Sequence, residues 1–272
     1  MKKLQRQKGF TLVELAIVLT IIGLLIGGIL KGQQLITNAR ITSTIAQVKA
    51  IEAATSTFRD TYAGLPGDMA NANLRVPNCN TCGATTGTDA GIGDGFIGAT
   101  GWDMRTPQVI VGRVVAVSTQ TLPEETFAFW YQLAQAGLLS GITSEVMTAA
   151  VAPTFGGGLP QAKLAGGFLV GNANTAATPA GKPVASTMSG LAIMEVESPT
   201  AVIAAAPAVG ASVMLPSVAG QMDRKMDDGL PGTGDVQGYG TAASCWTGAA
   251  PGYAYLENVQ SNDCGVIFKI GA

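Results

Sequence analysis

The sequence contains no histidine among its 272 residues, and only 12% of its residues are charged. The absence of histidine excludes every catalytic arrangement that needs an imidazole, and every histidine-ligated metal. The 16 lysine and arginine residues are scattered, so no basic face is predicted to neutralise phosphate groups, and nucleic acid is not an expected partner. Nucleophile-elbow, phosphate-loop and S-x-x-K motifs are also missing. We therefore expect a protein that is not an enzyme.

The most informative feature present is an apolar run near the N-terminus. Residues Phe10–Leu30 form a run of 21 residues whose one charged residue is Glu14. A helix of this length spans about 30 Å, the thickness of a bilayer core. The segment Met1–Lys8 carries four basic residues and no acid, whereas Lys31 alone follows the run directly. This asymmetry predicts a cytoplasmic N-terminus and an exported remainder.

Three interpretations of this run are a cleaved signal peptide, a plain signal anchor and an anchor with a special processing site. A conventional signal peptide has a shorter apolar stretch that ends in a small-x-small cleavage site. A plain signal anchor accounts for the length and the charges but not for Glu14. A carboxylate in hydrocarbon costs roughly 2.5–3.5 kcal/mol and usually has a partner. These points favour the third interpretation.

The segment Gly9–Glu14 (GFTLVE), behind a basic leader and ahead of an apolar helix, resembles the processing site of type IV prepilins and type II secretion pseudopilins. The resemblance implies that a prepilin peptidase cuts after Gly9 and that the new N-terminal residue, Phe10, is N-methylated. It also implies that Glu14 pairs with a Phe10 ammonium during assembly. The implied partners are other pilin-like subunits in a helical filament and an inner-membrane assembly platform.

The resemblance and the apolar pattern together predict an α+β, pilin-like fold. A long N-terminal helix, half transmembrane anchor and half domain spine, is expected to pack on a small antiparallel β-sheet with long loop insertions. The predicted parts are a basic leader (1–9), a transmembrane and filament-core helix (10–30), its amphipathic continuation (31–63) and an exported globular domain (64–272). The protein is expected first in the inner membrane as a single-pass protein with a periplasmic C-terminal domain, and then in a pilus or pseudopilus.

Local patterns predict the elements of the exported part. Apolar residues recur at three- and four-residue spacing along the helix continuation, at Ile41, Ile45, Val48, Ile51, Thr55, Phe58 and Tyr62. The sequence Gly64-Leu65-Pro66-Gly67 is predicted to end this helix. A capping box at Thr121 and Glu124 predicts a second helix that reaches about Leu139 with one apolar face. A short helix is expected over 216–226, and strands over 108–118, 168–171, 191–196 and 266–270.

Four cysteines are the candidates for disulfide bonds. An even number in an exported domain indicates disulfides, and of the three possible connectivities we favour the local pairs, Cys79–Cys82 and Cys245–Cys264. A redox function of the Cys-x-x-Cys pair and a four-thiolate zinc site are the alternatives. The loop-like surroundings of the first pair and the wide spacing of the second make structural bridges the better interpretation.

Four acids lie within thirteen residues, at Asp223, Asp227, Asp228 and Asp235. Some pseudopilins bind calcium near the C-terminus, so the resemblance makes these acids weak calcium candidates. The alternative is a solvated helix end followed by a turn. No other cofactor is expected.

The function implied by the resemblance is that of a structural subunit of a type IV pilus or a type II secretion pseudopilus. The size of the chain and its loop insertions favour a minor position in such a filament. The alternative is a membrane-anchored exported domain, binding or enzymatic, that does not polymerise.

Overall fold

The computed structural model describes residues 10–69, 71–79, 93, 95–97, 125–142, 154–173, 188–197, 212–248 and 252–271. The predicted strand at 108–118, the capping box at Thr121 and Glu124, the cleavage residue Gly9 and Cys82 lie outside these residues. The described part is α+β, as predicted, with a long N-terminal helix beside a small antiparallel sheet.

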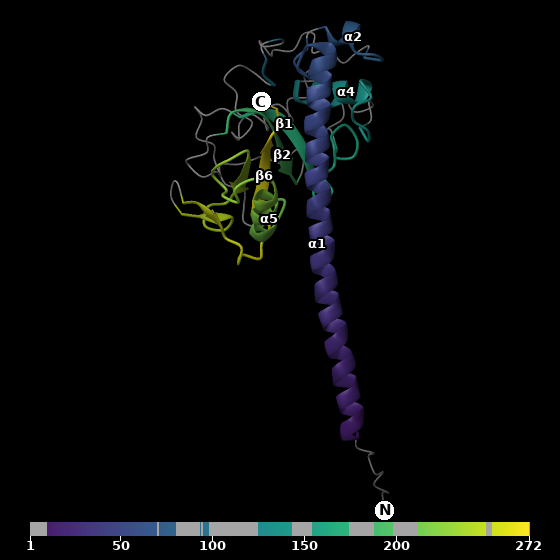
Figure 1. Ribbon diagram of the computed structural model, residues 1–272, viewed down its shortest axis with the longest axis vertical. Helices are drawn as coiled ribbons and strands as arrows, with labels where there is room; N and C mark the ends of the chain where they lie inside the picture. Colours follow the sequence, from purple (N-terminus) through teal and green to yellow (C-terminus); the bar gives the residue numbers. More distant parts are fainter. Residues whose placement is uncertain are drawn as a thin grey trace, which may run out of the picture.

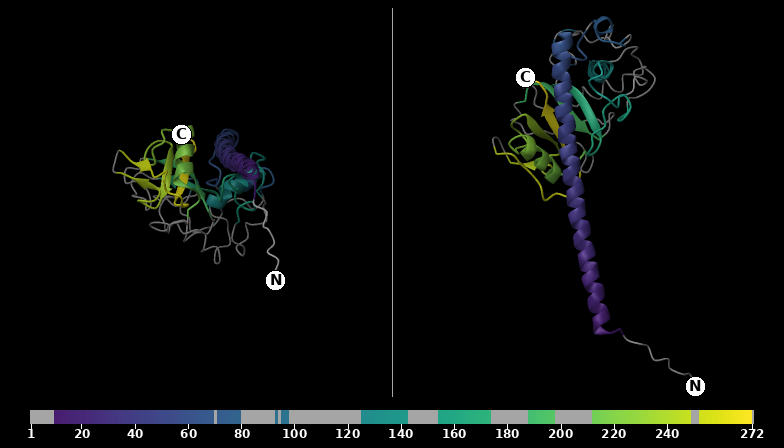
Figure 2. Two further views of the ribbon diagram at one scale, coloured as in Figure 1. Left: turned by 90° about the horizontal axis from the view of Figure 1, so that it is seen from below. Right: turned by 45° about the vertical axis from the view of Figure 1, so that its right-hand side comes forward.

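Helix α1 (Leu12–Tyr62) is the longest element, with 51 residues. Figure 1 shows that its first half extends away from the rest of the molecule, whereas its second half lies beside the sheet, and the right-hand view of Figure 2 agrees. Ala63 ends the helix with a left-handed backbone conformation (φ 49°), and its N–H donates to the carbonyl oxygen of Arg59. The helix therefore ends directly before the predicted Gly64–Gly67 turn.

The buried side of α1 begins only at Ile41. From there, Val48, Ile51, Thr55 and Phe58 of the predicted stripe are buried, and Ile45 and Tyr62 pack against the core from its edge. The period of the stripe places these side chains on one face of the helix. The second half of α1 is thus the spine of the domain, as the sequence predicted.

The main sheet has four antiparallel strands in the order β1-β2-β6-β3. They are β1 (Gly167–Ala173), β2 (Gly190–Val196), β6 (Cys264–Lys269) and β3 (Val236–Gly240). Strands β4 (Trp246–Thr247) and β5 (Ala254–Tyr255) form a separate two-stranded sheet. The sequence predicted β1, β2 and β6 but missed β3, because its two glycines (VQGYG) hide the strand pattern.

In the described part of the chain, three further helices flank these elements: α2 (Ala72–Arg75), α4 (Glu125–Gln135) and α5 (Pro216–Met226). The bounds of α5 agree with the prediction. The predicted apolar face of α4 is buried at Phe127, Trp130 and Tyr131, and burial extends beyond that face to every residue from Phe127 to Leu133. Helix α4 contacts both α1 and β1, and the Gly67 N–H donates to the Gln132 Oε1 atom, 2.7 Å away. Being covered from several sides, α4 has no solvent face along its middle.

Candidate functional site

The N-terminus of α1 carries the residues that the sequence singled out. Thr11 is the N-cap residue, and its hydroxyl oxygen accepts a hydrogen bond from the Glu14 N–H at 3.3 Å. In return, the Glu14 Oε2 atom accepts hydrogen bonds from the N–H and the hydroxyl group of Thr11, each at 2.9 Å. This reciprocal arrangement is a capping box, which satisfies backbone N–H groups that the first helical turn leaves open.

The capping box gives Glu14 a role that the sequence analysis missed. The signal was present, because Thr11 and Glu14 have the S/T-x-x-E spacing of such a box. The box uses Oε2 of the carboxylate, and no described residue hydrogen-bonds to Oε1. A carboxylate offers about four acceptor positions, so Glu14 can cap its own helix and still accept an external cation.

The apolar side chains of the first half of α1 are all exposed. Phe10 is 85% exposed, and the large hydrophobic residues after it stay exposed as far as Ile36. They are Leu12, Val13, Leu15, Ile17, Val18, Leu19, Ile21, Ile22, Leu24, Leu25, Ile26, Ile29, Leu30, Leu35 and Ile36. This segment is long and apolar enough to cross a membrane. Its most apolar stretch of 18 residues has no residue buried inside the protein. So large an apolar surface requires a membrane or other protein chains to cover it.

Comparison with known proteins identifies this same segment. Residues 4–30 match the prokaryotic N-terminal methylation motif, which is the signal motif of type IV pilins and pseudopilins. The match includes Gly9, Phe10 and Glu14. No curated protein and no solved structure matches this chain. The motif supports a pilin-like or pseudopilin precursor, and together with the exposed apolar helix it fits anchoring in the inner membrane.

The acidic cluster lies where α5 ends. Asp223, Asp227 and Asp228 each place one carboxylate oxygen within 4.8 Å of the others, whereas the Asp235 carboxylate lies 3.7 Å from the Lys269 Nζ atom. The Asp227 carboxylate accepts hydrogen bonds from the N–H groups of Asp235 and Val236. The Asp228 carboxylate accepts from the Leu230 N–H and the Thr233 hydroxyl group. These carboxylates stabilise the turn between α5 and β3, and the calcium site at these acids stays a prediction.

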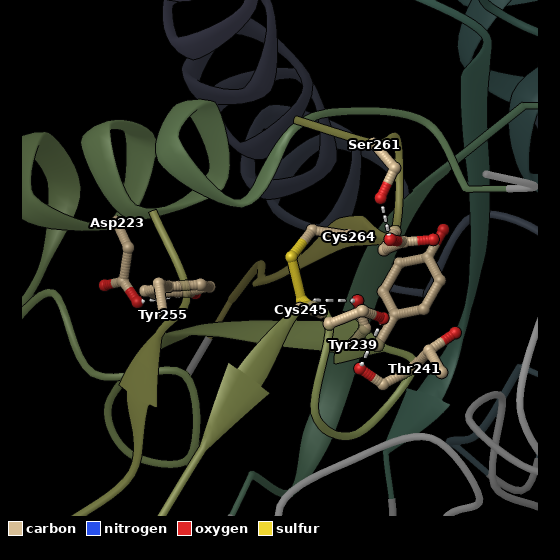
Figure 3. The surroundings of a disulfide bond; sticks show 9 residues. Asp223, Tyr239, Thr241, Cys245, Tyr255, Ser261 and Cys264 are labelled. Atoms are coloured by element: carbon tan, nitrogen blue, oxygen red, sulfur yellow. Dashed lines mark hydrogen bonds between the residues drawn. A yellow bond between two sulfur atoms is a disulfide. The ribbon is translucent and has the colours of Figure 1, made fainter. Parts of the chain in front are cut away.

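A disulfide bond joins Cys245 to Cys264 (Figure 3). Cys264 is the first residue of β6, and Cys245 directly precedes β4, so the bond links the two sheets. Both cysteines are fully buried, and their Cα atoms lie 5.1 Å apart. Cys79 is also buried and disulfide-bonded. The Cys245–Cys264 bond is one of the two local pairs that the sequence favoured.

A buried acid lies elsewhere in the sheet, on β2. Glu195 is fully buried, and no described residue forms a hydrogen bond of normal geometry with either of its carboxylate oxygens. Burial raises the pKa of Glu195 to about 8, although the backbone N–H of Ala165 slightly favours the charged form. The Tyr239 hydroxyl group donates to the Glu195 carbonyl oxygen at 2.5 Å, and burial raises the pKa of this tyrosine as well. At neutral pH both groups therefore keep their protons.

Proposed function

We propose that this protein is a structural subunit of a type IV pilus or a type II secretion pseudopilus. The observation that carries the proposal is the exposed apolar half of α1, which coincides with the methylation motif and continues into the buried spine of the domain. A helix divided in this way holds a folded domain at one end and leaves the other end free to enter a membrane or a helical bundle. The motif is typical of structural subunits, so the proposed role is non-enzymatic.

The precursor is stored in the inner membrane, with its leader (1–9) in the cytoplasm and its domain (64–272) in the periplasm. The prepilin peptidase removes the leader after Gly9, and Phe10 becomes the methylated N-terminus. An inner-membrane assembly platform then moves the subunit into a filament. There the apolar residues of 10–30 leave lipid and pack against the same segments of other subunits.

The charge of Glu14 determines where the subunit docks in the filament. In the membrane Glu14 lies four residues from the Phe10 amine, near an interface where water and headgroups solvate both charges. In a filament core that solvation is lost, and an unpaired buried charge costs several kcal/mol. Pairing of Glu14 with the Phe10 ammonium of a neighbouring subunit removes this cost at one axial position. The open Oε1 atom leaves room for that contact while Oε2 remains in the capping box.

A minor position in the filament is favoured by the size of the protein. The chain has a mass of 27.6 kDa, which is large for a subunit that must repeat closely along a filament. We therefore assign it to a small number of copies.

Mass spectrometry of the N-terminus of the native protein tests the proposal. We expect a chain that begins with N-methylated Phe10. A Gly9→Val variant should stay uncleaved, because a β-branched side chain keeps the backbone away from the peptidase, whereas Gly9→Ala should be cleaved in part. An intact Met1 in the native protein would instead support a membrane-anchored domain that does not polymerise.

A further inference from the structure

A cavity of about 1130 Å³ is lined by the C-terminal end of α1. Figure 1 shows that this end of the helix lies far from its apolar half. The walls of the cavity come from parts of the chain that are distant in the sequence. They are the last turns of α1, residues within 63–69 and 71–75, the residues Gly93, Gly95 and Phe96, and the ends of β1, β2 and β6. A volume of this order is large enough for a small molecule of several rings.

Three cations, Arg59, Arg75 and Lys269, and two acids, Asp60 and Asp68, line this cavity. The charge of Lys269 is partly compensated, because its Nζ atom lies 3.7 Å from a carboxylate oxygen of Asp235. The Asp68 side chain is buried, and its two oxygens accept hydrogen bonds from the N–H groups of Gly93 and Gly95, so its charge is already compensated. Within the described part of the chain, neither Arg59 nor Arg75 forms an ion pair. These two arginines therefore bring uncompensated positive charge to the cavity, in a chain whose formal charge is −2, and so favour an anion there.

Asn172, near the end of β1, adds a second and independent sign of a ligand. It lines the cavity, its side chain is only 5% exposed, and no described residue forms a hydrogen bond with its Nδ2 atom. An unsatisfied buried donor costs about 1–3 kcal/mol, so such groups in native proteins are normally satisfied. An oxygen atom of a molecule in the cavity would satisfy this one.

We propose that the cavity binds an acidic saccharide, in which one sugar unit carries a carboxylate among hydroxyl groups. The planar guanidinium of Arg59 matches a carboxylate. A hydroxyl group both accepts and donates, so a sugar can accept from the Asn172 amide and donate to the Asp60 carboxylate. The half-exposed ring of Phe96 and the side chain of Leu191 offer apolar contact to the C–H face of a sugar.

Asp60 is the residue that favours a saccharide over other anions. It is exposed, and no described residue forms an ion pair with it. An acidic peptide or a phosphate chain would place further negative charge beside the Asp60 carboxylate. Neither would offer it the hydroxyl donors that a sugar has. The proposal does not depend on filament assembly, because the cavity is separate from the apolar half of α1.

Isothermal titration of the detergent-solubilised full chain with trigalacturonate tests the proposal. We expect trigalacturonate to bind at one site per chain, with an affinity that falls as the salt concentration rises. Neutral galactotriose should not bind. Arg59→Gln removes one cation from the exposed rim and should weaken binding at least tenfold. Asn172→Leu should weaken it similarly, and thermal unfolding checks that this buried variant folds. Lys225→Gln is the matched control, because it removes an exposed cation of α5 that does not line the cavity.

Four results would overturn the proposal. The first is no binding of trigalacturonate at millimolar concentration, and the second is binding that Arg59→Gln leaves unchanged. The third is an equal loss with Lys225→Gln, which would indicate general charge attraction. The fourth is equally tight binding of hexaglutamate or inorganic sulfate, which would indicate an anion site that does not recognise the sugar.

Discussion

The hydroxyl group of Tyr255 donates a hydrogen bond to the Oδ2 atom of Asp223, 2.9 Å away, and so joins β5 to the last turn of α5 (Figure 3). The Gly229 N–H donates to the other oxygen of the same carboxyl group at 3.0 Å. Burial raises the pKa of Asp223 to about 7, and the hydrogen bonds from Tyr255 and Gly229 oppose that rise. Tyr255 therefore stabilises an acid that the small sheet covers.

Replacement of Tyr255 by phenylalanine should lower the free energy of unfolding by about 1–3 kcal/mol, because it leaves a buried carboxyl oxygen without its donor. Denaturant unfolding of the detergent-solubilised chain, followed by tryptophan fluorescence, measures this change. Tyr62→Phe is the control, since no described residue hydrogen-bonds to the Tyr62 hydroxyl group and its ring packs on Phe58. Equal effects of the two variants would show that the Tyr255 hydrogen bond contributes nothing.

Local sequence patterns predicted the elements whose signals are local. The stripe that starts at Ile41 has the period of a helix, and α5 has a proline at its first position and lies before a glycine turn. Strand β6 is rich in β-branched and aromatic residues. In each case the residues that determine the element lie within it, so no knowledge of the rest of the fold was needed.

Features that depend on distant parts of the chain could not be predicted in this way. Strand β3 is held by its pairing with β6, and its own glycines give no strand signal. The cavity unites Arg59 from α1 with Asn172 from β1, and nothing in either segment indicates the other. The methylation motif is the opposite case, because its residues are adjacent and could be recognised without the fold.

Glu195 should make the protein less stable as the pH rises. Its pKa in the folded protein is about 8, above the ordinary value of 4.5, so between these values the folded state holds a proton that the unfolded state has lost. The free energy of unfolding should therefore fall by up to about 1.4 kcal/mol per pH unit from about pH 4.5 to 8. Denaturant unfolding at several pH values measures this slope.

Glu195→Gln tests the assignment of the slope, because an amide of the same shape does not ionise. The variant should lose part of the pH dependence and should gain stability relative to the native protein at pH 8. Glu197→Gln, at an exposed position two residues away, should leave the slope unchanged. A native slope that survives in Glu195→Gln would assign it to another group.

Gly67 should tolerate no side chain. Its φ of +88° suits glycine, and a Cβ atom there would lie 2.5 Å from the Glu125 carbonyl oxygen of α4. Gly67→Ala should lower the free energy of unfolding by about 3 kcal/mol, from backbone strain and from overpacking together. Gly137→Ala isolates the strain, because φ is +72° there and a Cβ atom would meet nothing within 4 Å. Similar losses at both positions would contradict a tight contact between Gly67 and α4.

The disulfide between Cys245 and Cys264 should stabilise the domain by closing a loop. The two cysteines are separated by 19 positions, and a loop of this size corresponds to about 3 kcal/mol in the chain-entropy description. Replacing both by alanine should therefore lower the free energy of unfolding by about 2–4 kcal/mol. Peptide mapping without reductant should recover the linked peptides from the native chain. Two free thiols at these positions would refute the bond.

Glu14 should be required for entry into filaments but not for storage in the membrane. Glu14→Gln removes the charge and keeps the capping box, because glutamine at this position also accepts from the Thr11 N–H. We therefore expect normal expression, insertion and cleavage after Gly9, and a strong loss of this protein from filaments. Glu52→Gln is the control, since it removes a carboxylate of α1 that pairs with Lys49 at 2.8 Å, far from the motif.

Charge reversal at the same position separates pairing from helix capping. Glu14→Lys would place two cations together in a core of low dielectric constant, so it should impair incorporation more than Glu14→Gln does. Thr11→Val, in contrast, breaks the capping box and keeps the charge, so it should reduce incorporation less than either change. An immunoblot of sheared filaments measures each variant directly, because the total number of filaments need not change when a minor subunit is lost. Native levels of Glu14→Lys protein in that fraction would rule out the pairing mechanism, since no second anion in residues 10–30 could replace the lost charge.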